Sequence, residues 1–247
     1  MLERILRMKL QRLLSYTRRA VDDYQMIQPG DKIAVGISGG KDSLALLYAL
    51  AGLRRFYPNK FSIEAITVKL GFEGMDFSGI EKLCKELDVP YTIIDTEIAN
   101  VIFDIRKEEN PCSLCAKMRK GAFNEKAKEL GCNKSAYAHH QDDVIETSLM
   151  SLIYEGRYYT FSPVTYLDRM DITLIRPLIY VPECDIVGFQ NLYKLPVVKN
   201  TCPADGVTKR EYIKNLIKSL EQENEGTKDR LFAAITAGLL PAWKIPK

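Results

Sequence analysis

The 247-residue sequence lacks any apolar run long enough to cross a bilayer. Its amino-terminal stretch, MLERILRMKLQRLL, mixes Arg and Lys with Leu, so it has neither the uninterrupted apolar centre nor the small-residue cleavage site of a secretory signal. These absences argue against a membrane protein and against a secreted one. We therefore expect no membrane partner and a cytoplasmic location.

Cysteine and histidine are also scarce. The six cysteines are too few for a disulfide scaffold, and a cytoplasmic protein keeps them reduced; they stand at 84, 112, 115, 132, 184 and 202. The two histidines, His139 and His140, are adjacent, and no third ligand beside them completes a zinc site. Most cysteines are expected to be core residues, and only the pair at 112 and 115 has the spacing of a metal or redox motif.

Neither sign of charge dominates, because the net charge is only +3. The basic residues nevertheless gather in two stripes, within residues 1–20 and 117–134. The first contains Arg4, Arg7, Lys9, Arg12, Arg18 and Arg19, and the second contains Lys117, Arg119, Lys120, Lys126, Lys128 and Lys134. Such stripes suit a phosphate backbone, although solvated helix faces explain each stripe equally well.

Strand patterns alternate with helix patterns through most of the chain. The expected strands are 32–38, 61–70, 91–98, 134–140 and 172–181, and the expected helices are 2–24, 43–57, 76–89, 113–131, 142–156 and 182–195. This alternation predicts an α/β fold, a doubly wound parallel sheet with helices on both faces. Beyond about residue 205 only helix is expected. We divide the chain into an amino-terminal basic helix (1–30), an α/β domain (31–204) and a carboxy-terminal helical appendage (205–247).

The sequence SGGKDS, Ser38–Ser43, joins the first expected strand to the next helix. In a sheet of this kind, ligands bind at the carboxyl ends of the strands. Gly39 and Gly40 permit a close backbone approach, and free N–H groups, two hydroxyls and Lys41 suit an anion. Asp42 is unexpected there unless it holds Mg²⁺ beside phosphate oxygens. A tight turn without a ligand is the alternative.

This loop is neither a Walker A sequence nor a dinucleotide fingerprint. It resembles the SGGxDS loop, or PP-loop, of the N-type ATP pyrophosphatases. The resemblance implies an adenine-nucleotide α-hydrolase fold and the use of ATP.

A second polar cluster, HHQDDVIET, ends the fourth expected strand and opens a helix. Asp142 and Asp143 suit a helix cap and the helix dipole. Parallel topology also brings them near the Ser38–Ser43 loop, which favours metal binding or proton transfer. The stretch resembles the GHHxDDxxET motif of tRNA-modifying members of the same superfamily. Ala138 stands where those proteins usually have Gly, and its methyl group could shift the fit of a bound nucleotide.

Cys112 and Cys115 form a C-x-x-C pair near the start of a helix. Such a pair can be redox-active, bind zinc or hold an iron–sulfur cluster. Two thiolates do not complete a metal site. Cys202, in an expected loop after the helix 182–195, could supply a third thiolate.

Together these motifs resemble the TtcA family of tRNA 2-thiocytidine synthetases over roughly residues 20–215. The stretches that carry the resemblance are SGGKDS, CSLCAKMRKG, HHQDDVIET, IRPLIYV and the late TC. The resemblance implies that ATP and Mg²⁺ bind at SGGKDS and HHQDDVIET. The implied ATP contacts are Gly36, Ile37, Ser38, Gly39, Gly40, Lys41, Asp42, Ser43, Val68, Ala138, His139 and Asp143, with Asp42 on Mg²⁺.

The same resemblance implies that Cys112, Cys115 and Cys202 hold a 4Fe–4S cluster and leave one iron free of protein. It places Arg119 near the reacting base, so the implied catalytic residues are Lys41, Asp42, Arg119 and Asp143. The implied RNA contacts are Arg4, Arg7, Arg12, Lys117 and Lys120.

The implied reaction is tRNA thiolation, most often at cytidine 32. The C2 oxygen of a pyrimidine attacks the α-phosphorus of ATP and releases pyrophosphate, and sulfur delivered through the cluster then expels AMP. The target base has to leave its stack or lie in a loop. The expected partners are tRNA and a sulfur donor, either a cysteine desulfurase or sulfide, and a homodimer is one expected assembly.

Two features depart from the family patterns. Family members often have C-x-x-C at the late site, whereas only Cys202 is present here, and the chain has no amino-terminal zinc-finger cysteine pairs, unlike the larger thiolases of uridine 54. Several alternatives stay open. They are a lysidine synthetase or an amide ligase of the NAD or GMP synthetase type, 2-thiolation of a uridine, a non-catalytic nucleotide sensor, and structural zinc at the cysteines.

Overall fold

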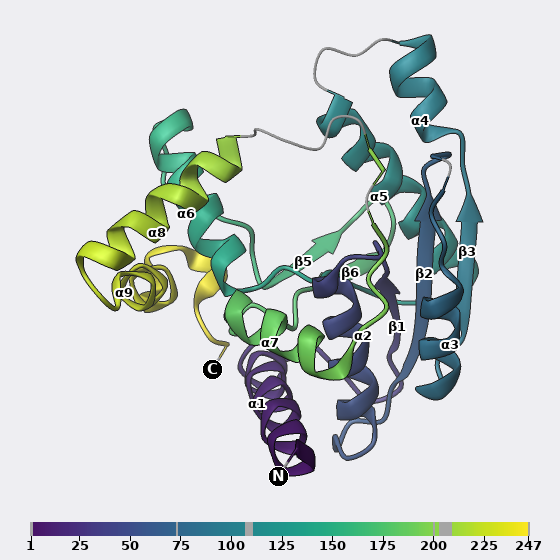
Figure 1. Cartoon of the computed structure of the whole chain (residues 1–247), viewed down its shortest axis with the longest axis horizontal. Coiled ribbons are helices and arrows are strands. Elements are labelled where there is room, and N and C mark those ends of the chain that lie inside the picture. Colours follow the sequence, from purple (N-terminus) through teal and green to yellow (C-terminus); the bar gives the residue numbers. More distant parts are fainter. Residues whose placement is uncertain (1, 73, 107–110, 200, 203–208, 247) are drawn as a thin grey trace.

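The protein, seen here as a computed structural model, is built around one six-stranded sheet (Figure 1). The structure describes residues 2–72, 74–106, 111–199, 201–202 and 209–246, without the side chains of 2–8 and 238–239. The strand order is β3-β2-β1-β4-β6-β5. The parallel strands are β1 (Lys32–Gly36), β2 (Ser62–Lys69), β3 (Tyr91–Asp95), β4 (Lys134–Ala136) and β6 (Ile172–Ile175), and β5 (Val164–Leu167) pairs antiparallel with β6. The predicted doubly wound α/β class is confirmed.

Helices occupy both sides of this sheet (Figure 1). They are α1 (Leu2–Asp23), α2 (Lys41–Arg54), α3 (Ser78–Glu86), α4 (Ile98–Asn100) with the π-helical turn Val101–Ile105, α5 (Pro111–Glu129), α6 (Gln141–Glu155), α7 (Glu183–Tyr193), α8 (Lys209–Glu223) and α9 (Thr227–Ala234), which leads into the short turns Ile235–Leu239 and Pro241–Trp243. None of the helices in the described ranges is both long and apolar enough to traverse a membrane.

Alternate residues of the central strands face two different helical layers. Ile33 and Val35 of β1 are buried in a large core that α2 and α7 share. Ala34, between them, faces a smaller core that contains Ile66 of β2 and Phe123 of α5. Burial on both faces explains why β1 is a continuous apolar run rather than an alternating one.

The sheet differs from the predicted one at its β6 edge. The expected strand 172–181 is too long, because β6 ends at Ile175 and Pro177 has no N–H to continue the ladder. Leu178 and Val181 are fully buried but belong to a turn. The antiparallel strand β5 was missed, since it has only four residues and its Tyr166 is more than half exposed.

The expected carboxy-terminal appendage packs against the α/β domain. Ile213 and Ile217 of α8 are buried against Ile145 of α6, and α9 also contacts α6. Trp243 is 1% exposed, and its indole N–H donates to the Phe161 carbonyl at 3.2 Å. The boundary expected between 204 and 205 lies outside the described residues, so the three-part division stays a prediction.

The chain reverses its direction of winding beside β1. β2 and β3 lie on one side of β1, and β4, β6 and β5 lie on the other. β1 leads into α2 and β4 leads into α6, so both connections begin at the carboxyl edge of the sheet. This switch point is where open α/β sheets bind ligands.

Candidate active site

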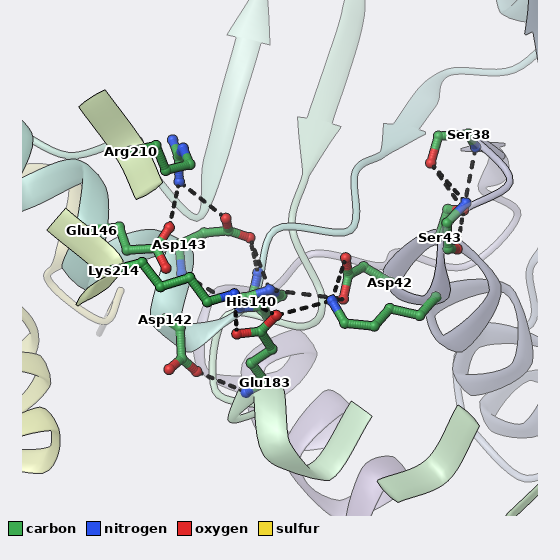
Figure 2. Close-up of polar contacts among 12 residues, drawn as sticks. Ser38, Asp42, Ser43, His140, Asp142, Asp143, Glu146, Glu183, Arg210 and Lys214 are labelled. Carbon is green, nitrogen blue, oxygen red and sulfur yellow. Dashed lines mark hydrogen bonds and ion pairs between the residues drawn. The ribbon is translucent and has the colours of Figure 1, made fainter. Parts of the chain in front are cut away.

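The turn from β1 into α2 is held by hydroxyl groups (Figure 2). Ser43 Oγ accepts from the Ser38 N–H at 3.2 Å and donates to the Gly40 carbonyl at 2.9 Å. Gly39 has φ +86°, and a Cβ on it would lie 3.0 Å from Cβ of Val198, so two constraints favour glycine. Because α2 begins at Lys41, the positive end of this helix and its unpaired N–H groups form an anion site at the turn.

A cavity of about 640 Å³ opens at this turn, a size typical of small-molecule sites. Most of the implied ATP contacts line it, namely Gly36, Ile37, Ser38, Gly40, Asp42, Ser43, Val68, Ala138, His139 and Asp143. Apolar side chains, among them Ile66, Phe72 and Phe77, form another part of its wall. Two implied contacts, Gly39 and Lys41, are not part of the lining. The cavity therefore combines a polar loop with an apolar surface that suits a nucleotide base.

Lys41 is absent from the cavity lining and takes part in an ion-pair network instead. Its Nζ lies 2.9 Å and 3.1 Å from the two Asp42 oxygens and 3.0 Å from Glu183 Oε1. Glu183 also accepts from Lys214, at 2.9 Å from Oε2. Burial raises the pKa of Glu183, but the hydrogen bonds from Lys214 and Lys41 outweigh it and bring the pKa to about 2. Without a ligand, Lys41 thus neutralises carboxylates rather than phosphate.

The two aspartates of HHQDDVIET have different roles at the start of α6. His140 is the N-cap, and Asp143 closes a capping box by accepting from the His140 backbone N–H at 3.0 Å. His140 Nε2 also lies 3.4 Å from Asp143 Oδ2 and 3.8 Å from Asp42 Oδ1. Asp142 instead accepts from the Glu183 backbone N–H at 2.7 Å. Asp143 and Asp42 are therefore the two carboxylates close to the cavity and to each other.

Cations from the carboxy-terminal helices complete this acidic cluster (Figure 2). Arg210 of α8 donates to Asp143 at 3.1 Å and to Glu146 at 2.9 Å. Lys228 of α9 donates to Asp142 at 2.6 Å. Each of these cations offsets a carboxylate that would otherwise repel a polyphosphate.

His139 forms part of the cavity wall as a neutral imidazole. Burial and, to a smaller extent, the nearby Arg176 guanidinium lower the pKa of His139 to about 4. Its ring lies 4.6 Å from the Phe161 ring, and its Nδ1 has no hydrogen-bond partner among the described residues. A neutral imidazole offers one donor and one acceptor to a ligand.

The three thiols of the predicted cluster site lie within electrostatic range of one another at Cys115. Cys112 and Cys115 lie in the first turns of α5, one exposed and one half-buried. Burial raises the pKa of the Cys115 thiol, Arg119 lowers it, and the thiols of Cys202 and Cys112 raise it again. Cys202 therefore lies within electrostatic range of the pair. In the described ranges, no group of three or more His, Cys, Asp or Glu side chains is already arranged to hold a metal. Thiol donors nonetheless have the chemistry of an iron–sulfur or zinc centre.

The helix that carries Cys112 and Cys115 also lines the cavity. Ala116, Arg119 and Lys120 of α5 face it together with Phe123. One helix therefore carries two of the three thiols and also faces the cavity that opens at the Ser38–Ser43 loop.

Comparisons with known proteins agree with this arrangement. Residues 7–220 match the model of the PP-loop domain family. The tRNA-cytidine(32) 2-sulfurtransferase of Geobacter sulfurreducens is 37% identical over 88% of this chain and 86% of its own length. Those of Pelobacter propionicus and Citrifermentans bemidjiense are 38% and 34% identical over 91% of this chain, and over 85% and 89% of their own.

The chain belongs to the tRNA-cytidine(32) 2-sulfurtransferase family of PP-loop proteins. The family predicted from the sequence motifs is confirmed. A solved structure, the U34-tRNA thiolase NcsA from Methanococcus maripaludis with its [4Fe-4S] cluster, superposes with a TM-score of 0.74 at 24% identity. The match covers 92% of this chain and 77% of that one, and it shows that the two share a fold.

Two implied RNA contacts of this PP-loop protein lie on the exposed surface of α5. Lys117 and Lys120 are both exposed, and Lys120 also lines the cavity. Arg12 is engaged elsewhere, because its Nε lies 2.7 Å from Asp185 of α7. The side chains of Arg4 and Arg7 lie outside the described residues. Figure 1 shows α1 and α5 at opposite ends of the molecule, so the two basic stripes do not form one surface.

Several functional residues of the PP-loop site were missed from the sequence. Arg210, Lys214 and Lys228 come from the expected carboxy-terminal appendage, to which the sequence assigns no function. Glu183 stands at the start of an expected helix, and no motif singles it out. Their pairing with the PP-loop acids depends on how α6, α7, α8 and α9 pack, and no local motif encodes it. The acidic first turn of α7 was the one available signal, since a buried cluster of carboxylates needs cations nearby.

Proposed function

We propose that this PP-loop protein is an ATP-dependent tRNA sulfurtransferase that replaces the C2 oxygen of cytidine 32 by sulfur. The observation that carries this proposal is the shared cavity. It joins the Ser38–Ser43 loop to the α5 surface of Arg119 and Lys120, one turn beyond Cys115. The names of the family members supply the nucleotide and the reaction.

In the first step, the C2 oxygen of the base attacks the α-phosphorus of ATP. The bond from that phosphorus to the bridging oxygen breaks, and pyrophosphate leaves. The loop N–H groups, the Ser38 and Ser43 hydroxyls and the amino terminus of α2 stabilise the negative charge that develops there. Asp42 and Asp143 are the residues that would hold Mg²⁺, which would neutralise phosphate oxygens when bound.

In the second step, a C–S bond forms at C2 and the C2–O bond breaks, so that AMP leaves with the former base oxygen. Cys112, Cys115 and Cys202 would hold a 4Fe–4S cluster, which would supply the activated sulfur when bound. Arg119 faces the cavity one turn after Cys115 and would orient the base between the nucleotide and the thiols. The apolar wall excludes water, which protects the adenylated base from hydrolysis.

The proposal also covers the substrate, the sulfur donor, the cellular location and the assembly. tRNA is the substrate, a cysteine desulfurase or free sulfide donates sulfur, and the enzyme works in the cytoplasm, with a homodimer as the proposed assembly. The target base has to leave its stack to reach a cavity at the edge of the sheet.

The decisive experiment uses two tRNA transcripts that differ only in having C or U at position 32. Anaerobically purified protein with ATP, Mg²⁺ and sulfide should form 2-thiocytidine in the first, together with AMP and pyrophosphate, and no thiolated base in the second. Mass spectrometry of the nucleosides gives the answer. Thiolation of the uridine, or lysine-dependent pyrophosphate release by a colourless protein, would replace this proposal by one of the alternatives.

A further inference from the structure

A row of aromatic rings leads away from the cavity wall. Tyr137 and His139 both line the cavity, with ring centroids 6.1 Å apart. Phe161 continues the row behind His139, at 4.6 Å and an interplanar angle of 35°. The Arg176 guanidinium lies over the Phe161 ring, 5.0 Å from its centroid. The row therefore starts inside the cavity and continues toward the loop between α6 and β5.

The outer end of this row is exposed. Tyr158 and Tyr159, in the loop between α6 and β5, are 37% and 46% exposed. Arg157 lies over the Tyr159 ring, 4.8 Å from its centroid. Burial lowers the pKa of Arg176 to about 10, and the neighbouring Tyr137 and Tyr159 oppose that shift. Arg176 thus lies near one tyrosine of the cavity and one tyrosine of the surface.

The loop that presents these rings is rigidly held. Thr160 is buried, and its hydroxyl donates to the Val144 carbonyl at 3.2 Å. Arg176 donates to the Ser162 carbonyl, and Trp243 donates to the Phe161 carbonyl. Hydrogen bonds at three neighbouring positions, 160–162, hold the backbone that follows Tyr158 and Tyr159, which lowers the ordering entropy that this loop would lose on binding.

We propose that Arg157, Tyr158 and Tyr159 form a stacking surface for the unpaired tRNA bases next to the modified nucleotide. Exposed aromatic rings and arginine planes are the groups on which proteins stack single-stranded RNA bases. Tyr159 is two residues from Phe161, the last ring of the row that starts in the cavity, so a base in the cavity and its neighbour outside would lie at the two ends of this row. This inference rests on the proposed function and adds a surface separate from the lysines of α5.

The test compares Tyr159→Ala and Tyr159→Trp with Phe56→Ala, which truncates a 52% exposed ring just beyond the carboxyl end of α2, away from the cavity. Binding of an unmodified anticodon stem-loop is measured by fluorescence anisotropy without ATP, and ATP binding by calorimetry. Tyr159→Ala should weaken RNA binding about tenfold, Tyr159→Trp should bind like the wild type, and neither should change ATP affinity. Phe56→Ala should bind RNA normally.

Wild-type affinity of Tyr159→Ala for the stem-loop would overturn the inference. So would a change from dimer to monomer by light scattering in Tyr159→Ala alone, because the rings would then contact a second copy of the chain. The RNA-binding and ATP-binding measurements do not depend on the thiolation reaction. If the wild type binds RNA through Tyr159 yet forms no 2-thiocytidine, the proposed reaction fails and the stacking surface stands.

Discussion

Arg210 and Asp143, 67 positions apart in the chain, form an ion pair in which Arg210 Nη1 lies 3.1 Å from Asp143 Oδ1. The other Asp143 oxygen accepts from the His140 backbone N–H. One oxygen is thus fixed by the cap of α6 and the other by α8. The helix α8 therefore contacts a carboxylate that lines the cavity.

Replacing Arg210 by Ala should destabilise the protein by about 1–2 kcal/mol. The reason is Glu146, which is 4% exposed and would lose its cation partner. Urea unfolding measures the effect, with Lys218→Ala on the same helix as the control. The double variant Arg210→Ala/Glu146→Gln should recover most of the loss, because no unpaired buried carboxylate remains. If the double variant is no more stable than the single one, Glu146 is not the cause.

The loop and the acid motif could be predicted from the sequence because each is contiguous. Six residues specify the Ser38–Ser43 turn, and the glycine conformation, the serine hydrogen bonds and the start of α2 follow locally. The role of Cys202 as a third ligand stays a prediction implied by the family resemblance, since no spacing rule relates residues so far apart in the chain; Cys202 does lie within electrostatic range of Cys115.

The charges that surround the loop could not be predicted in the same way. Lys41 looked like a phosphate ligand, but its partners in the folded chain are Asp42 and Glu183. Arg12 looked like part of a basic stripe, but Asp185 lies beside it. A side chain with a long flexible stem takes the partner that tertiary packing offers, and the local sequence does not record that partner.

Asp42→Ala should reduce tRNA-dependent pyrophosphate release at least about 100-fold, because it removes the carboxylate proposed to hold Mg²⁺ at the phosphates. The visible absorption of the anaerobically purified protein should not change, since Asp42 belongs to α2 and is not one of the thiols proposed to hold the cluster. Asp95→Ala is the matched control, because its 82% exposed side chain lies at the carboxyl end of β3. Loss of both signals would mean that Asp42 mainly supports the structure.

Cys202→Ser should remove the iron bound by the anaerobically purified protein, which is expected to be about four atoms per chain. Cys184→Ser changes an exposed thiol of α7 and should keep the full iron content. Metal analysis together with the visible spectrum distinguishes the outcomes. Undiminished iron in Cys202→Ser would show that another group is the third ligand, and zinc in place of iron would contradict the cluster altogether.

Glu183 should make stability depend on pH in the acid range. Its pKa is about 2 in the folded protein, since the hydrogen bonds from Lys214 and Lys41 outweigh the effect of burial, and its ordinary value is 4.5. A carboxylate whose pKa is lowered by folding stabilises the folded protein. That stability is fully present above the ordinary pKa and is lost as the pH falls toward about 2; for this shift the contribution is at most about 3 kcal/mol.

Urea unfolding of the wild type and of Glu183→Gln between about pH 3 and pH 7 measures this contribution. The difference in unfolding free energy should be constant above about pH 5.5 and should shrink below it. A difference that is the same at every pH would show that the Lys41 and Lys214 contacts do not select the ionised form, and the ion pairs that hold Lys41 beside Asp42 would then have no electrostatic basis.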